Sequence, residues 1–326
     1  MAVIALDIGG TKIASAVCMP DGSMLFARKR LLQGRTGTAV GTLLTEQLTN
    51  LLAAARRHGI VVDAVGVCVP GIASSQTGRV WAPNIPGWED YPLEQELRAA
   101  TPLPVYIESD RTCYLSGEMW QGAAKACHSA VFIAVGTGIG AGIVVDGRFL
   151  HGAGDIIGAT GWMALQSPYQ EAYAACGCFE YYASGNGIGA RAREAVGADK
   201  TYRGVLRRKR VARLTAHDVF AAYQAGDPLA GEILGKAIKL WGMAAANLVS
   251  LLNPQKIIWG GGVFGPATRF LDDIYQEACR WAQPISIRQV EFVASQLSGH
   301  AGLTGAAYLA IRQTQEAPLV HPQPFT

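Results

Sequence analysis

The stretch Ala5-Leu6-Asp7-Ile8-Gly9-Gly10-Thr11-Lys12 ends an apolar strand in a glycine turn, and two later stretches repeat this pattern. They are Ala134-Val135-Gly136-Thr137-Gly138-Ile139-Gly140 and Ile257-Ile258-Trp259-Gly260-Gly261-Gly262. Glycine allows positive φ and brings backbone N–H groups close to a ligand, because no Cβ intervenes. Backbone N–H groups and threonine hydroxyls together form a cradle for phosphate. The three turns therefore predict nucleotide phosphates as ligands.

Other phosphate-binding motifs do not fit these turns. A P-loop has the pattern G-x-x-x-x-G-K-[ST] leading into a helix, and the sequence contains no such string. A dinucleotide-binding turn has G-x-G-x-x-G between a strand and a helix. Residues 136–140 instead read G-x-G-x-G and lead into the apolar run 143–145, which predicts another strand. A single glycine turn is more often structural, but three turns, two of them with threonine, favour phosphate binding.

Around the first turn the sequence predicts three strands, followed by alternating helices and strands. Strands are expected at 3–6, 12–19, 24–29, 61–69, 104–108 and 256–259, a hairpin at 130–149, and helices at 38–58, from 110 towards 125, and at 302–311. Strand-hairpin units with glycine turns thus occur early and again in mid-chain. This pattern predicts two related α/β halves, although no sequence-identical repeat is present.

The composition limits the class of protein. The chain has 326 residues, of which 50% are hydrophobic, 16% are charged and 39 are glycine. This length is enough for one large or two ordinary domains. Disordered chains have low hydrophobicity and high net charge, so that class is excluded, and the absence of a G-X-Y period excludes collagen. The net charge of +3 gives no indication of a nucleic-acid partner.

The cysteines and one long uncharged stretch bear on location. Seven cysteines, an odd number, lie mostly in apolar runs, and the chain opens with M-A-V-I-A-L-D, without a basic leader. We expect a reduced, cytoplasmic protein with buried thiols. Residues 126–145 carry no charge and are long enough to span a bilayer. Because glycine alternates at 136, 138, 140 and 142, two strands around a tight loop are expected there, and no membrane partner.

A basic segment stands out at residues 200–213. Seven of its fourteen residues are lysine or arginine, and Tyr202 is the one aromatic residue among them. Nucleic-acid surfaces interleave basic and aromatic side chains, so a solvated surface segment is the favoured interpretation.

The D-I-G-G-T-K string, the G-T-G-I-G-A-G hairpin and the W-G-G-G turn together resemble the sugar-kinase branch of the actin-like ATPases, and most closely the ROK family of bacterial hexose kinases. Further similar segments occur in the same order along most of the chain, at 82–88 (A-P-N-I-P-G-W), 109–110 (S-D), 177–180 (G-C-F-E), 184–185 (S-G) and 301–307 (A-G-L-T-G-A-A). No regulator-type helix-turn-helix precedes the first strand, so the resemblance implies an enzyme rather than a repressor.

The resemblance implies an α/β, two-domain actin-like ATPase (RNase H-like) fold with an interdomain active-site cleft. The domains it implies are 1–116 plus about 302–315, and 117–301, followed by a tail at 316–326. It implies an ATP-dependent kinase that transfers the γ-phosphoryl group to a hydroxyl, the 6-hydroxyl, of a free hexose, amino-hexose or N-acetyl-hexosamine. It also implies Mg²⁺ as cofactor and a homodimer.

Asp110 is the predicted general base. A carboxylate at the carboxyl end of a strand can accept the proton of a sugar hydroxyl as that hydroxyl attacks the γ-phosphoryl group. A Ser-Asp pair at this position also suits the N-terminus of the next helix. Position alone leaves both roles open, and the family resemblance favours catalysis.

The resemblance assigns the other site residues. The phosphate and ATP ligands are Asp7, Gly9, Gly10, Thr11, Lys12, Gly136, Thr137 and Gly138, with Asp7 binding Mg²⁺ through water and Gly260, Gly261 and Gly262 lying against the adenosine. The sugar ligands are Asn84, Ser109, Asp110 and Glu180. Trp162 stands where the family has a histidine, and it is expected either to stack on an apolar face of the sugar or to fill the space that the histidine and zinc would occupy. A turn asparagine and a first-turn helix glutamate are the structural alternatives for Asn84 and Glu180.

The match to the family breaks in two places. The family string G-E-I-G-H reads Gly158-Ala159-Thr160-Gly161-Trp162 here, so that Ala159 and Trp162 replace a glutamate and a histidine. In the family that histidine often binds zinc together with three cysteines, whose positions here hold Glu171, Tyr173 and Cys178. One cysteine of the three therefore remains, and Cys176-Gly177-Cys178 is only half a zinc site, without a histidine at the matching spacing. Zinc is predicted to be absent.

These replacements leave two outcomes open, a changed substrate or a loss of activity. Since Asp110 and all three turns remain, a changed substrate is favoured. The alternative is a non-catalytic or weakly active sugar-binding sensor. An actin-like ATPase acting on protein is a third possibility, against which the Asn84 loop argues.

Overall fold

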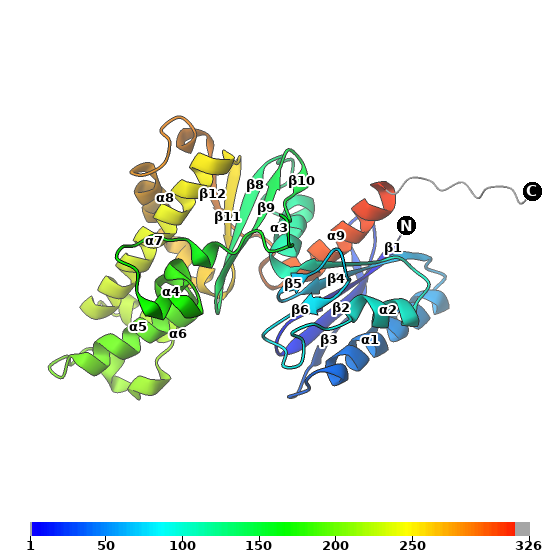
Figure 1. Cartoon of the computed structure of the whole chain (residues 1–326), viewed down its shortest axis with the longest axis horizontal. Coiled ribbons are helices and arrows are strands. Elements are labelled where there is room, and N and C mark those ends of the chain that lie inside the picture. Colours follow the sequence, from blue (N-terminus) through cyan, green and yellow to red (C-terminus); the bar gives the residue numbers. More distant parts are fainter. Residues whose placement is uncertain (1, 317–326) are drawn as a thin grey trace, which may run out of the picture. The chain divides into compact units, whose positions relative to one another are not determined.

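The computed structural model describes residues 2–316 (Figure 1), which form two compact units. Unit 1 contains the described residues up to Gln121 and from His300 onwards, and unit 2 contains Gly122–Gly299. Each unit has its own five-stranded sheet. Most of the tail predicted at 316–326 lies outside the described residues.

Unit 1 is built on a mixed sheet with the order β3-β2-β1-β4-β7. Its strands are β1 (Ala2–Ile8), β2 (Lys12–Cys18), β3 (Met24–Leu31), β4 (Val62–Val69) and β7 (Val105–Ser109), and a small hairpin is made of β5 (Ile72–Ala73) and β6 (Val80–Trp81). The first three strands are antiparallel, and β1, β4 and β7 are parallel to one another. The strands expected from the sequence are therefore confirmed.

Helices cover both faces of this sheet. They are α1 (Thr38–Arg57), α2 (Leu93–Ala100), α3 (Asp110–Gln121) and α9 (Ala301–Glu316). Val65 and Val67 of β4 share a core with Leu44 of α1, whereas a Cβ on Gly66 between them would overlap the carbonyl of Ala306 in α9. Since successive strand residues point to opposite faces, α1 and α9 lie on opposite faces.

Unit 2 has a sheet with the order β10-β9-β8-β11-β12. Its strands are β8 (Ala130–Val135), β9 (Ile139–Val145), β10 (Arg148–Phe149), β11 (Lys256–Gly260) and β12 (Glu291–Ala294). The uncharged stretch at 126–145 is thus mainly the β8–β9 hairpin, as predicted, and β11 runs parallel to β8 and β12. Among the described residues, no helix has the length and apolar character needed to cross a bilayer.

The helices of unit 2 include several for which the sequence analysis made no prediction. They are α4 (Cys178–Ala183), α5 (Gly185–Ala198), α6 (Ala216–Gln224), α7 (Pro228–Leu252) and α8 (Leu271–Cys279), with short 3₁₀ turns such as Thr160–Trp162 and Glu171–Ala175. The long α7 begins at an Asp227 cap, with proline in its first turn, and ends at Asn253 in the left-handed conformation. These are the usual start and stop signals of a helix.

The two sheets share one topology. In each sheet, three strands that follow one another in the sequence are antiparallel, β1–β3 in unit 1 and β8–β10 in unit 2. The first strand of each three also begins a parallel set, β1-β4-β7 and β8-β11-β12. The two related α/β halves expected from the sequence are therefore confirmed. In a parallel sheet the carboxyl ends of the strands meet at one edge, which is where ligands bind in open α/β folds.

Candidate active site

In unit 1, strand register brings two predicted site carboxylates to the same sheet edge. Asp7 near the end of β1 pairs with Cys68 of β4, and Cys68 pairs with Glu108 of β7. Ser109 ends β7, and Asp110 is the first residue of α3. Asp7 and Asp110 are partly buried, and the charge of Asp7 raises the pKa of Asp110. The edge therefore presents an acidic pair at the place expected for a ligand.

Burial and charged neighbours set the pKa of Asp110. Burial raises the pKa of its carboxyl to about 6, and the negative charge of Asp7 adds to the rise. Opposing this, Arg111 beside it and a hydrogen bond from Tyr114 lower its pKa. The phenol oxygen of Tyr114 lies 3.5 Å from Oδ2 of Asp110. A base with a pKa just below neutral is ionised at physiological pH and still accepts a proton readily.

Asp7 lies between a thiol, a lysine and the last helix. Burial raises the pKa of its carboxyl, while a hydrogen bond from Cys68 and the charge of Lys12 lower it. Gly302 of α9 lies directly against this carboxyl group, because a Cβ there would be 2.8 Å from its carbon and from both oxygens. Carboxylate and phosphate oxygens are what Mg²⁺ prefers, so Asp7 fits the predicted role of magnesium ligand.

The predicted sugar loop is fixed to the first glycine turn and to the loop before α1. Asn84 is exposed, and a Cβ on Gly10 would lie 3.2 Å from its carbonyl oxygen. The backbone N–H of Gly37 donates to Pro86 (2.8 Å), and the buried indole N–H of Trp88 donates to the Gly37 carbonyl (3.0 Å). Asn84 is thus held beside the predicted phosphate turn within the same unit.

Ser109 is placed differently from the other predicted sugar ligands. It is buried, and its hydroxyl lies 3.1 Å from the hydroxyl of Thr112 and accepts a long hydrogen bond from the Thr112 backbone N–H. Its own backbone N–H donates to the carboxylate of Glu108. These contacts support the first turn of α3, which begins at Asp110.

In unit 2, the other two glycine turns meet at the edge of the second sheet. The turn between β8 and β9 is closed by a hydrogen bond from Gly136 N–H to Gly138 O (2.9 Å), and the N-terminus of α5 joins it through Gly185 N–H, which donates to Gly136 O (2.8 Å). Gly261 has φ of +89°, and a Cβ there would overlap the carbonyl of Val135. The position therefore requires glycine. Backbone groups of the two predicted nucleotide turns are thus brought together.

Glu180 of α4 binds the same turn. Its Oε2 accepts a hydrogen bond from the backbone N–H of Ile139 (2.6 Å). Gly138 and Gly161 both lie against its carboxylate. Burial raises the pKa of Glu180, and the hydrogen bond from Ile139 lowers it. One carboxylate oxygen therefore supports the turn, a role that the sequence analysis did not predict.

The segment that departs from the family pattern is rich in aromatic contacts. Trp162 is 58% exposed, while its backbone packs against Gly177. The buried phenol of Tyr173 lies 3.0 Å from that of Tyr182, and the Arg191 guanidinium lies 3.5 Å from the ring centre of Tyr181. Within the described residues, no group of three or more histidine, cysteine, aspartate or glutamate side chains is arranged to hold a metal.

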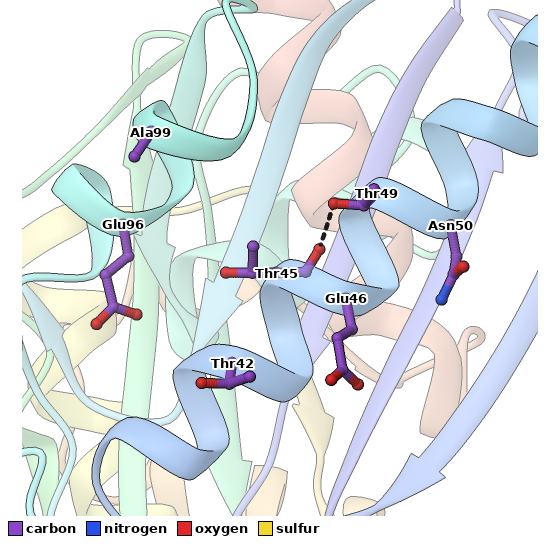
Figure 2. A pocket seen from close by; sticks show the side chains of 7 residues that line it. All are labelled: Thr42, Thr45, Glu46, Thr49, Asn50, Glu96 and Ala99. Carbon is purple, nitrogen blue, oxygen red and sulfur yellow. Dashed lines mark hydrogen bonds between the residues drawn. The ribbon is translucent and has the colours of Figure 1, made fainter.

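Two surface depressions lie elsewhere. One, of about 500 Å³, runs between α1 and α2 of unit 1, and Figure 2 shows Glu46 and Glu96 on its two sides. The other, of about 460 Å³, lies in unit 2 beside Asp227 and Arg269. Neither is lined by a predicted site residue.

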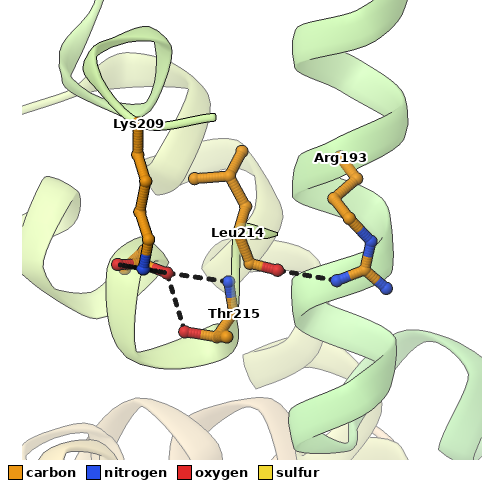
Figure 3. Close-up of polar contacts among 5 residues, drawn as sticks. Arg193, Lys209, Leu214 and Thr215 are labelled. Atoms are coloured by element: carbon orange, nitrogen blue, oxygen red, sulfur yellow. Dashed lines mark hydrogen bonds and ion pairs between the residues drawn. The ribbon is translucent and has the colours of Figure 1, made fainter. Parts of the chain in front are cut away.

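The basic segment is folded onto its own unit. Lys209 forms an ion pair with Asp218 (2.8 Å), and the carboxylate of Asp218 also caps α6 through Thr215 (Figure 3). Arg193 donates to the carbonyl of Leu214 (2.6 Å), and Arg207 donates to the carbonyls of residues 196 and 199. Lys209 and Arg207 are thus paired locally, and the other basic residues of the segment 200–213 are exposed, which agrees with the predicted surface segment.

The structure thus brings the predicted site residues together in two sets. Unit 1 holds Asp7, Gly9, Gly10, Thr11, Lys12, Asn84, Ser109 and Asp110, and unit 2 holds Gly136, Thr137, Gly138, Trp162, Glu180, Gly260, Gly261 and Gly262. Sequence reasoning missed Cys68, Tyr114 and Gly302, which contact Asp7 or Asp110. Only Tyr114 carried a local signal, because it follows Asp110 by four residues on one helix.

Comparisons with known proteins show the family and the fold of the chain. A model of the ROK family matches residues 3–313. The chain is 32% identical over 317 residues to a glucokinase of Halalkalibacterium halodurans, with 95% of each chain covered. It is 27% identical to an N-acetyl-D-glucosamine kinase of Aliivibrio salmonicida, covering 94% of this chain and 98% of that protein. A ROK family glucokinase from Streptomyces griseus, solved with glucose and AMPPNP, superimposes with a TM-score of 0.75 at 29% identity, covering 96% of this chain and all of the other.

Proposed function

The chain belongs to the ROK family, has the two-domain actin-like fold and is an ATP-dependent sugar kinase, and from this premise we propose that it phosphorylates the 6-hydroxyl of a free hexose, amino-hexose or N-acetyl-hexosamine with Asp110 as general base. The observation that carries the proposal is the position of Asp110. Its partly buried carboxyl, with a pKa raised to about 6, lies at the same sheet edge as Asp7, which stands near the end of β1.

The proposed steps assign one task to each group. Asn84, beside the first glycine turn, binds sugar hydroxyls, and the Asp110 carboxylate accepts the proton of the attacking hydroxyl. The oxygen of that hydroxyl then bonds to the γ-phosphorus, while the bond to the leaving ADP oxygen breaks. In unit 1, residues 9–12 bind phosphate. In unit 2, the turns at 136–138 and 260–262 bind the nucleotide through backbone N–H groups.

The cofactor and the state of the protein are also proposed. Mg²⁺, held through water by Asp7, would neutralise charge on the phosphates. Zinc is not expected, since Glu171 and Tyr173 stand where the resemblance places two of the zinc cysteines, and the phenol of Tyr173 is engaged with that of Tyr182 (3.0 Å). Trp162, which is exposed, would stack on an apolar sugar face. We further propose that the protein is a homodimer, as the resemblance to the family implies. We also propose a cytoplasmic location, because ATP is required and all seven cysteines are free.

The experiment is a coupled ADP-release assay over plain and N-acetylated hexoses. We expect sugar-dependent turnover whose rate falls below about pH 6, because the base must be ionised. The Asp110→Asn variant should lose turnover by about 10²-fold or more while still binding sugar. A 6-deoxy sugar should bind without being phosphorylated.

Two results would contradict the proposal. ADP release that is independent of sugar would indicate a different ATPase reaction, and sugar binding without turnover on any sugar would indicate a sensor. Zinc at one ion per chain in the purified protein would separately contradict the metal assignment.

A further inference from the structure

We propose that Tyr114 is a positioning residue for the general base, holding one carboxylate oxygen of Asp110 so that the carboxylate faces the acceptor hydroxyl in a fixed orientation. This inference rests on the proposed role of Asp110. It concerns a residue that the sequence analysis did not select and that lies outside the glycine turns and the sugar loop.

The geometry follows from the helix. Asp110 is the first residue of α3 and Tyr114 lies four residues later, so both side chains lie on one face of the helix, one turn apart. The Tyr114 hydroxyl donates to Oδ2 of Asp110 over 3.5 Å, and the backbone N–H of Arg111 also donates to this carboxylate. Two donors from one helix thus hold this carboxylate. Catalytic hydrogen bonds are often long without substrate and shorten in the complex.

The chemistry of the phenol suits this role. Burial raises the pKa of Tyr114 further above its usual value, so the hydroxyl remains protonated wherever Asp110 titrates. A neutral O–H can donate to the ionised carboxylate without competing for the proton of the sugar. It thereby stabilises the form of Asp110 that acts as a base.

Several titratable or charged groups surround Asp110, and few of them favour its ionised form. They are Asp7 on β1, Cys68 on β4, and Arg111 and Cys113 on α3, while Lys12 on β2 acts on Asp7. Asp7 disfavours a second negative charge, and both thiols are buried with raised pKa values. Arg111 and Tyr114 are the groups that favour ionised Asp110. Removing the hydroxyl should therefore change both the orientation and the ionisation of the base.

The test is the Tyr114→Phe variant of the full chain, assayed between pH 5 and 9 with its best sugar. We expect kcat to fall about tenfold, with KM for the sugar changed less than twofold and the acidic limb of the rate profile moved upward by about one pH unit. If the Tyr114 ring only fills space, kcat and the acidic limb of the rate profile should stay unchanged, because phenylalanine has nearly the same shape. That result would overturn the inference.

A matched control is Tyr308→Phe in the same unit. The Tyr308 ring stacks on Trp120 (5.6 Å between centres), and we expect this variant to keep the kcat and the pH profile of the parent. Thermal unfolding of both variants checks that each is folded.

A second measurement does not depend on activity. In ¹³C-labelled protein, the NMR titration midpoint of the Asp110 carboxyl should be higher in Tyr114→Phe than in the parent. Coincident midpoints would overturn the inference. If Asp110→Asn keeps full activity, the proposed function of Asp110 fails instead, and the NMR midpoints still decide whether Tyr114 acts on it.

Discussion

At the scale of single residues, a missing Cβ decides where the Asp7 carboxylate lies. Gly302 is the second residue of α9, and a Cβ there would be 2.8 Å from the carboxyl carbon and both oxygens of Asp7. Asp7 therefore reaches the first turn of a helix, where a negative charge is favoured. The glycine is required for this close approach.

The Gly302→Ala substitution should separate activity from stability. The new methyl group displaces the Asp7 carboxylate, so we expect kcat to fall at least tenfold. The unfolding free energy should change by less than about 2 kcal/mol, because the helix propensity of alanine offsets the clash by about 1 kcal/mol. Steady-state kinetics and urea denaturation measure the two effects.

Gly235→Ala is the matched control, because Gly235 lies within α7 and a Cβ there meets no atom within 4 Å. It should keep full activity and gain up to about 1 kcal/mol of stability. A Gly302→Ala enzyme with parental kcat would show that the Asp7 position does not matter for catalysis.

At the scale of elements, Glu180 connects α4 to the β8–β9 turn. Its Oε2 accepts from the Ile139 N–H at 2.6 Å, whereas the sequence analysis assigned Glu180 to the sugar or, as the alternative, to the first turn of a helix. A carboxylate has two oxygens, and both roles are compatible if Oε1 binds sugar while Oε2 holds the turn.

Two substitutions of Glu180 separate these roles. Glu180→Gln keeps an oxygen that accepts from Ile139, so KM for ATP should stay near the parental value, while KM for the sugar should rise about tenfold through loss of charge. Glu180→Ala removes both interactions and should raise both constants. If neither variant changed KM for the sugar, Glu180 would act on the turn alone.

Local features of the site could be predicted from the sequence, whereas contacts between distant segments could not. Strands ending in glycine turns are local patterns, so the turns after β1, β8 and β11 were found from sequence. The Ile139–Glu180 and Asp7–Gly302 contacts join residues 41 and 295 positions apart. They depend on how helices dock on sheets, which no local pattern contains. The buried residues of α7, such as Ile233, Leu234 and Ala237, recur at helical spacing as those of α1 do, so this helix could have been predicted from the sequence and was missed.

At the scale of the whole molecule, the two units differ in how the chain builds them. Unit 2 is continuous, whereas unit 1 needs a helix that the chain supplies only after unit 2 is complete. That helix, α9, contacts α3, β1, β4 and β7 of unit 1, with Leu303, Ala306 and Ala310 buried. The core of unit 2, around residues such as Trp241 and Phe179, draws on no residue of α9.

Fragments of the chain should therefore behave differently. We expect residues 122–299 alone to unfold cooperatively in urea, as a unit with its own core does. A chain ending at residue 299 should lose the native signal of unit 1 and expose it to proteolysis, because the α9 face of β4 is uncovered. In the full chain, Leu303→Ala should destabilise unit 1 by about 2–4 kcal/mol and leave the unfolding of the 122–299 core nearly unchanged. A shortened chain that resists proteolysis throughout would contradict this, since it would mean that unit 1 folds without the helix that covers Gly66 and adjoins Asp7.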